Sequence, residues 1–161
     1  NSYLGHIAKA NSLHSIFPSG VDAIAIFSSE NSYISPNWYP TKEQTHRHVP
    51  TWNYQVVHLK GRLSFDDSKK AKLRAVGTLT KIHERMHFGD AEWKMSDAPK
   101  DYMEQMLDSI VAFQFDIKTI LAKSKLSQNR EIHDYNSVKK TMKEQNKKIL
   151  FDAMDNMERD E

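Results

Sequence analysis

The sequence predicts an α+β fold, an antiparallel barrel of strands with helices packed on its outside. Three observations support this class. Apolar and polar residues alternate over 111–118, an apolar stripe at helical spacing runs over 73–86, and the segments follow in the order β, β, β, α, α, β, α. This order is more typical of an antiparallel barrel than of a parallel βαβ sheet.

The predicted strands are short runs that are either apolar or alternate in polarity, and turn residues bound them. They lie at 3–8, 21–28, 32–35, 54–65 and 111–118, with a bulge expected at Gly61. The first run is only half a strand, and a lone strand needs neighbours for its backbone groups. We therefore expect that the chain continues ahead of Asn1.

Three helices are predicted. The first begins at a cap, Asp66 or Asp67, and buries one stripe made of Leu73, Val76, Leu79, Ile82, His83 and Met86. The second covers 99–109 and is capped by Asp97. The third is a docked C-terminal helix over 134–158. We expect one barrel domain at 1–130 and a C-terminal helical appendage at 131–161.

Composition excludes several function classes. The 161 residues include no cysteine, so disulfides, iron–sulfur clusters, thiolate zinc sites and cysteine nucleophiles are excluded. The net charge of +2 does not by itself predict nucleic-acid binding. No P-loop, G-x-G-x-x-G or G-x-S-x-G motif occurs. No run approaches the length of a membrane span, and we expect a cytoplasmic protein.

Two histidine patterns resemble metal sites. Residues 83–87 read H-E-x-x-H, which on a helix places two imidazoles where they can grip zinc, although a third ligand such as Glu104 is a guess. His46 and His48, with His58 further along, form the second pattern. Against the first pattern, His83 belongs to the apolar stripe of its helix and no x-x-G-x-x-H extension follows. A polar cationic loop explains the second pattern better, so no metal is predicted.

Aromatic and amide side chains gather in three segments, 33–39, 49–54 and 123–130. The tryptophans and tyrosines offer flat surfaces to a planar ring, while hydroxyls, amides and cations can hold its edges and a phosphate. The segments suit a phosphorylated heteroaromatic ligand. An equally good interpretation makes Trp38, Trp52 and Tyr54 core or interface aromatics.

Four blocks occur in a fixed order. They read GHIAKAN at 5–11, YISPNWY at 33–39, VPTWNY at 49–54 followed by Val57, His58 and Gly61, and KLSQNR at 125–130. The chain resembles the PaiB family in these blocks and also around Trp93, 99–107 and 110–113. The resemblance covers nearly the whole chain, and only the last thirty residues match loosely.

The resemblance implies an antiparallel split β-barrel of the FMN-binding, flavin-reductase-like kind, with external helices. It further implies a homodimer with cofactor sites at the subunit interface and a negative transcriptional regulator, for which DNA is a candidate partner. Family chains carry strands ahead of the first block that this sequence lacks. No helix-turn-helix supports DNA binding, and acidic residues offset the lysines of the C-terminal tail.

Site residues follow from the resemblance block by block. The lysine of the first block would neutralise the FMN phosphate, one tryptophan would cover the isoalloxazine ring, and the last block would close the site from the partner subunit. The residues implied to bind the cofactor are Lys9, Asn11, Ser35, Trp38, Tyr39, Thr51, Trp52, Asn53, Lys125, Gln128, Asn129 and Arg130.

Two other functions stay open. The same fold can host a flavin-dependent oxidoreductase or oxidase, but only His6 and His58 offer acid–base chemistry, so we predict no catalytic residue and do not expect an enzyme. A binding module for another planar ligand is the third hypothesis.

Overall fold

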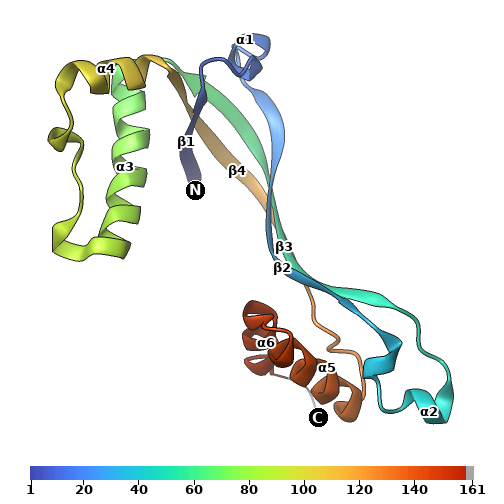
Figure 1. Cartoon of the computed structure of the whole chain (residues 1–161). Helices are drawn as coiled ribbons and strands as arrows, with labels where there is room; N and C mark the ends of the chain where they lie inside the picture. The colour runs from blue at the N-terminus through green and yellow to red at the C-terminus, as the bar shows by residue number, and fades with distance from the viewer. Residues whose placement is uncertain (159–161) are drawn as a thin grey trace. The chain divides into compact units, whose positions relative to one another are not determined.

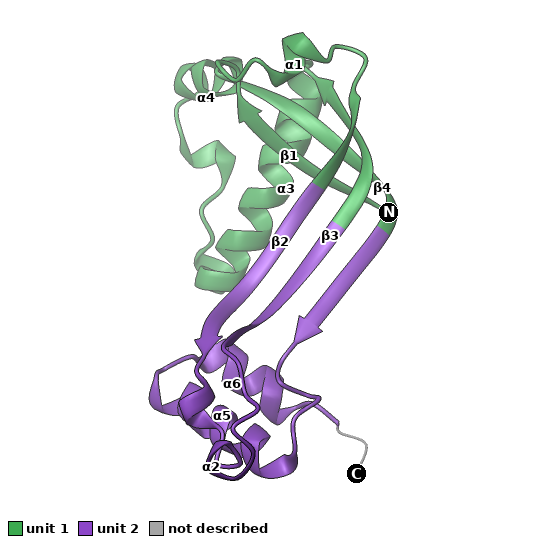
Figure 2. Cartoon of the chain, turned by 90° about the vertical axis from the view of Figure 1, so that its right-hand side faces the viewer, with its two compact units in different colours: residues 1–24, 59–119 green, residues 25–58, 120–161 purple. Residues whose placement is uncertain are grey.

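A computed structural model of the chain describes residues 1–158 (Figure 1). The chain divides into two compact units, unit 1 from residues 1–24 and 59–119 and unit 2 from residues 25–58 and 120–161 (Figure 2). The predicted boundary at residue 130 therefore falls inside unit 2. Residues 159–161 of the predicted appendage lie outside the described residues.

Within residues 1–158 the strands form a four-stranded sheet, ordered β1-β4-β3-β2. Its members are β1 (Ser2–Ala8), β2 (Val21–Ile34), β3 (Thr51–Asp66) and β4 (Ile110–Lys125). β1 pairs antiparallel with β4, and Gly5 lies opposite Phe113. β2 and β4 run from unit 1 into unit 2 and β3 runs back, so these neighbours are antiparallel too. The predicted α+β class is confirmed, and the antiparallel sheet agrees with a split barrel.

The strands are longer than the sequence predicts. β2 joins the two predicted runs at 21–28 and 32–35 into one strand of fourteen residues. Ser29, Glu30 and Asn31 have low strand propensity, but β2 has β3 as a neighbour in the sheet, and pairing overrides propensity. β4 likewise continues to Lys125, beyond the alternating run.

Unit 1 contains α1 (Leu13–Ile16), α3 (Lys69–Phe88) and α4 (Lys100–Asp108), with the 3-10 turns η2 (Gly89–Ala91) and η3 (Met95–Asp97). Both predicted caps are wrong. Ser68 caps α3, because its side chain accepts from the Ala71 N–H. Asp66 instead accepts from the N–H of Ser68 itself. Pro99 occupies the cap position of α4. No described helix has the length and apolar character needed to cross a membrane.

The apolar stripe predicted for α3 is not the buried face of this helix. Leu73, Ile82 and Met86 are exposed, whereas Lys72 and Ala75 are buried. The prediction failed because it used only the spacing of the apolar residues and His83. Lys72 is buried because its ammonium finds a carboxylate, that of Asp67.

Unit 2 contains η1 (Pro36–Trp38), α2 (Lys42–Thr45), α5 (Ile132–Glu144) and α6 (Lys148–Asp155). The single predicted C-terminal helix is therefore two. The chain turns between them at Asn146, whose φ of 57° lies in the left-handed region that a helix cannot continue through.

The core of unit 2 joins segments that lie far apart in the sequence. It consists of Ile34, Tyr39, Leu126, Tyr135, Val138, Met142, Leu150 and Met154. Glu30 on β2 fastens α6 to this core, because its Oε2 accepts from the backbone N–H groups of Ile149 at 3.1 Å and Leu150 at 3.2 Å. Those donors have no partner within the helix, so Glu30 satisfies its N-terminus.

Candidate functional site

Unit 2 carries a hollow of about 500 Å³ over β2 and β3. Its lining combines two aromatic rings with hydroxyl and amide side chains: Ser28, Ser29, Asn31, Trp52, Tyr54, Gln55 and Val56. A volume of this size is typical of pockets for small organic ligands.

The two rings provide the flat surface of this hollow. Trp52 is 52% exposed, and it meets Tyr33 edge to face at 5.9 Å between ring centroids. Tyr54 has the ammonium of Lys123 over its ring, 5.8 Å from the centroid. A half-exposed tryptophan held by a second ring offers its free face to a planar ligand.

Two lysines of β4 border the same aromatic segment. Lys125 Nζ donates to Thr51 Oγ1 and, at 2.7 Å, to the carbonyl oxygen of Trp52. Neither Lys123 nor Lys125 forms an ion pair with a carboxylate of residues 1–158. Uncompensated cations beside an aromatic surface favour a ligand that carries negative charge.

Asn53 lies between Trp52 and Tyr54 in the sequence of β3, but its side chain points into the core. It is wholly buried, accepts from Ser127 Oγ at 3.0 Å and donates to the sulfur of Met154 at 3.9 Å. Ser127 has a φ of 60°, so the chain turns sharply after β4. The hydrogen bond between Ser127 and Asn53 therefore fixes the turn after β4 to β3, next to Trp52.

The remaining residues of the last block shape this turn. Gln128 accepts from the Leu126 N–H at 2.7 Å and donates to the Ser124 carbonyl at 2.8 Å, whereas Asn129 is exposed. Arg130 lies over the ring of Tyr39, 4.6 Å from Cζ to the centroid, and its Nη1 is 3.3 Å from His48 Nδ1. The last block, 125–130, thus packs against the second block, 33–39.

The second block is mostly structural in this geometry. Ser35 caps η1 by accepting from the Asn37 N–H at 3.2 Å, and Trp38 packs against the core of unit 2. Tyr39 is buried, and its hydroxyl lacks a hydrogen-bond partner among the described residues.

Lys9 and Asn11 belong to unit 1, unlike the other ten predicted residues. Lys9 Nζ lies 2.9 Å from Asp67 Oδ2, and Asn11 Oδ1 accepts from the Leu13 N–H at 3.0 Å. Hydrogen bonds from Lys72 and Lys9 lower the pKa of Asp67 to about 2. The charge of Lys9 is thus balanced inside unit 1.

The hollow also contains residues that were not predicted: Ser28, Ser29, Asn31, Tyr54, Gln55 and Val56. Tyr54 and the neighbouring Lys123 lie at the ends of the predicted aromatic segments, so the sequence did indicate that they could contact a ligand. Ser28 to Asn31 carried no signal, because they read as the break between two strands that the structure joins.

The histidine patterns do not assemble into ligand sets. His83 and His87 are exposed near the end of α3, and His48 bonds with Thr41 at 3.0 Å and Arg130. Among residues 1–158 no group of three histidine, aspartate or glutamate side chains is placed to hold a metal ion.

The antiparallel sheet with outer helices places the chain among α+β proteins of split-barrel type. The chain belongs to the PaiB family of FMN-binding domains, because the family model described as "Putative FMN-binding domain" matches residues 1–119. FMN is the cofactor that this family membership implies.

Curated relatives occur in bacteria and fungi. The chain is 35% identical over 135 residues to protease synthase and sporulation protein PAI 2 of Bacillus subtilis, covering 83% of this chain and 61% of the relative. An uncharacterized protein of Saccharomyces cerevisiae is 37% identical over 79 residues, 48% of this chain and 46% of its own. One of Aspergillus fumigatus is 31% identical over 119 residues, 66% and 46% respectively. The chain thus spans less than two thirds of these relatives.

The hollow of unit 2 fits a flavin by the chemistry of its residues. A flavin has a planar tricyclic ring, hydrogen-bonding edges and, in FMN, a phosphate. Trp52 and Tyr54 match the ring, and Ser28, Ser29 and Asn31 match its edges. Lys123 and Lys125, which lie beside this lining and form no ion pair within residues 1–158, match the phosphate. Bound FMN supplies reversible electron-transfer chemistry, and the protein supplies orientation and electrostatics.

Proposed function

We propose that this chain binds FMN in the hollow of unit 2 and works as a flavin-binding regulator of gene expression. One observation carries the proposal: the half-exposed ring of Trp52 lies beside Tyr54 and two lysines that have no carboxylate partner in residues 1–158. A structural aromatic would be covered, and structural lysines would be paired or dispersed.

The predicted site residues divide into two roles in this proposal. Thr51, Trp52 and Lys125 contact the cofactor together with Tyr54 and Lys123. A second set supports the hollow from the core and the turns without touching the ring: Ser35, Trp38, Tyr39, Asn53, Gln128 and Arg130. Lys9, Asn11 and Asn129 stay predictions from the resemblance.

Titration with FMN and with riboflavin tests the site. Riboflavin has the same ring but no phosphate, so the two ligands separate the two parts of the hollow. Trp52→Ala should weaken both ligands by about tenfold or more, as expected when stacking on an aromatic is lost. Lys125→Gln should weaken FMN by about tenfold and leave riboflavin unchanged.

Trp93 provides the matched control, because it is similarly exposed but belongs to unit 1. Trp93→Ala should bind FMN as the native chain does. Absence of FMN binding to the native chain, or equal loss in Trp52→Ala and Trp93→Ala, would rule out this location.

The regulatory part of the proposal includes a homodimer in the cytoplasm. Its support in this chain is the large apolar side chains that unit 2 exposes on β2 and β4, namely Ile26, Phe27, Ile120 and Leu121. Because neighbouring residues of a strand face opposite sides of the sheet, each of these pairs places one apolar side chain on each face, and a second copy of the chain would cover the side chains of one face. The name of the Bacillus relative links that protein to protease synthesis and sporulation, which supports a role in gene expression.

Sedimentation tests the dimer. Ile120→Glu should shift the chain to monomers, while Ile149→Glu, which alters an equally exposed isoleucine on α6, should not. Salt-dependent retention on DNA, lost together with the dimer, would support the regulator. Rapid reduction of bound FMN by NADH without DNA retention would instead identify an oxidoreductase.

A further inference from the structure

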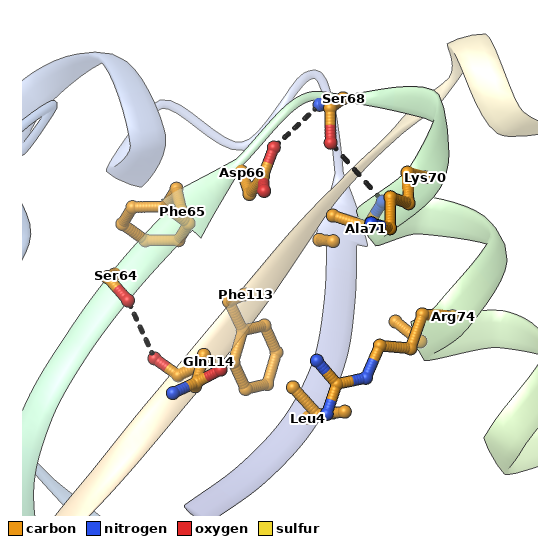
Figure 3. A pocket seen from close by; sticks show the side chains of 12 residues that line it. Leu4, Ser64, Phe65, Asp66, Ser68, Lys70, Ala71, Arg74, Phe113 and Gln114 are labelled. Carbon is orange, nitrogen blue, oxygen red and sulfur yellow. Dashed lines mark hydrogen bonds between the residues drawn. The ribbon is translucent and has the colours of Figure 1, made fainter.

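Unit 1 contains a cavity of about 480 Å³ between α3 and the strands β1, β3 and β4 (Figure 3). Half of its twelve lining residues are apolar: Leu4, Phe65, Ala71, Ala75, Ala112 and Phe113. The volume falls in the range of pockets that hold small organic molecules.

The apolar walls are built around two fixed rings. A side chain at Gly5 would collide with the ring of Phe113, so the glycine gives that ring its place. Phe65 is held by His14, edge to face with 6.5 Å between the ring centroids. Alanines on both the helix and the sheet leave the space between these walls free.

Two cations of α3, Arg74 and Lys70, also line the cavity. Figure 3 shows the Arg74 guanidinium extending toward Leu4 and Phe113. Neither cation forms an ion pair with a carboxylate of residues 1–158. Asp66, the one acidic residue of the lining, instead accepts from the Ser68 N–H at 2.8 Å. The cavity therefore combines apolar walls with two cations and one carboxylate, so the charge of its lining is net positive.

We propose that this cavity binds a small organic anion with a planar apolar body, of the aryl carboxylate class. Arg74 pairs with the carboxylate, since a guanidinium matches both carboxylate oxygens at once. The ring packs against Leu4 and Phe113, where apolar surface leaves water. An inorganic anion would leave this apolar wall unused. The proposal is independent of FMN, because every lining residue belongs to unit 1.

Calorimetric titration and saturation-transfer NMR with benzoate and 2-naphthoate test the proposal. Benzamide serves as the neutral analogue of benzoate, and inorganic phosphate serves as an anion without an apolar body. We expect saturable binding with a dissociation constant of about 1 mM or lower, as suits ligands of this size. Naphthoate should bind more tightly than benzoate, and benzamide and phosphate at least about tenfold more weakly.

Two arginines of the same helix give a matched pair of variants. Arg74→Gln should weaken naphthoate by about tenfold, the loss expected for a charge-assisted hydrogen-bonded pair. Arg85→Gln, which alters an exposed arginine outside the lining, should bind as the native chain does. Circular dichroism checks that both variants fold.

Four results would overturn the proposal: no saturable binding of either carboxylate, equal binding of benzamide, phosphate binding as tight as that of naphthoate, or unchanged affinity in Arg74→Gln. Since none of these ligands is a flavin and FMN is titrated separately, failure here leaves the FMN proposal untouched, and the reverse holds as well.

Discussion

Lys72 Nζ lies 2.7 Å from Asp67 Oδ1, and this pair joins the start of α3 to the residue that follows β3. The Lys72 side chain is only 5% exposed, so Asp67 is what makes its burial tolerable. Lys9 of the first block reaches the other oxygen of the same carboxylate at 2.9 Å. One aspartate thus holds two lysines from separate segments of unit 1.

Asp67→Asn should destabilise the chain in a pH-dependent way. The pKa of Asp67 is about 2 in the folded chain, below the value of about 3.9 of an unfolded aspartate. Its contribution is therefore complete above about pH 4 and disappears as the pH falls toward 2. Urea unfolding should show a loss of about 1–2 kcal/mol at pH 7, mainly from the unpaired buried Lys72, and little difference near pH 2.

Glu104→Gln is the control for this charge effect. Glu104 also pairs with a lysine, Lys69 at 2.8 Å, but both side chains are exposed. Pairs in water contribute little, so its stability should stay near that of the native chain at both pH values. Equal losses in the two variants would contradict the special role of Asp67.

Removing the carboxylate of Glu30 should loosen α6. Glu30→Ala leaves the N–H groups of Ile149 and Leu150 without their acceptor, at a cost of about 1 kcal/mol, as for a lost helix cap. Hydrogen exchange of these two amides should accelerate. Glu43→Ala, an exposed glutamate of α2, should change neither the stability nor the exchange of α6.

Asn53→Leu should destabilise unit 2 although it makes a polar core residue apolar. The substitution removes the acceptor of the buried Ser127 hydroxyl and the donor to Met154, at an expected cost of about 1–3 kcal/mol. Thermal unfolding measures the loss. The double variant Asn53→Leu, Ser127→Ala should recover part of it, because the hydroxyl that was left unpaired is gone; no recovery would contradict this explanation.

Asn146 should tolerate glycine better than alanine. With its φ of 57°, Asn146→Ala places a β-carbon in the left-handed region and should cost about 1 kcal/mol, whereas Asn146→Gly should be close to neutral. Gln145→Ala, at a φ of −86°, is the matched substitution in ordinary backbone and should have little effect. Denaturant unfolding of the three variants checks the order.

Local periodicity predicted the elements whose neighbours agree with it. The alternation over 111–118 became the unit 1 end of β4. The single helix predicted over 134–158 was wrong, because the chain turns at Asn146. Periodicity could not predict which face of α3 is buried. That outcome depends on the ion pair of Lys72 with Asp67, which no helical stripe encodes.

The sequence predicted the site only where the residue types themselves indicate ligand binding. The exposed ring of Trp52 and the lysine next to it stood in the aromatic segments, and the structure brings Thr51, Trp52 and Lys125 into contact. Sequence could not separate Asn53, which points into the core, from its neighbours. Nor could it find Ser28 and Asn31, because their place in the hollow depends on the pairing of β2.

The composition of the unit 2 core sets an order for folding during synthesis. Ile34 and Tyr39 are made early, but their partners Leu126, Val138 and Met154 emerge from the ribosome about a hundred residues later. Until then the part of unit 2 that has been synthesised leaves the apolar side chains of its incomplete core exposed. All residues of unit 1 have been synthesised once Thr119 has emerged, so unit 1 can fold before unit 2. Unit 2 is therefore the part of the chain that chaperones would have to protect during synthesis.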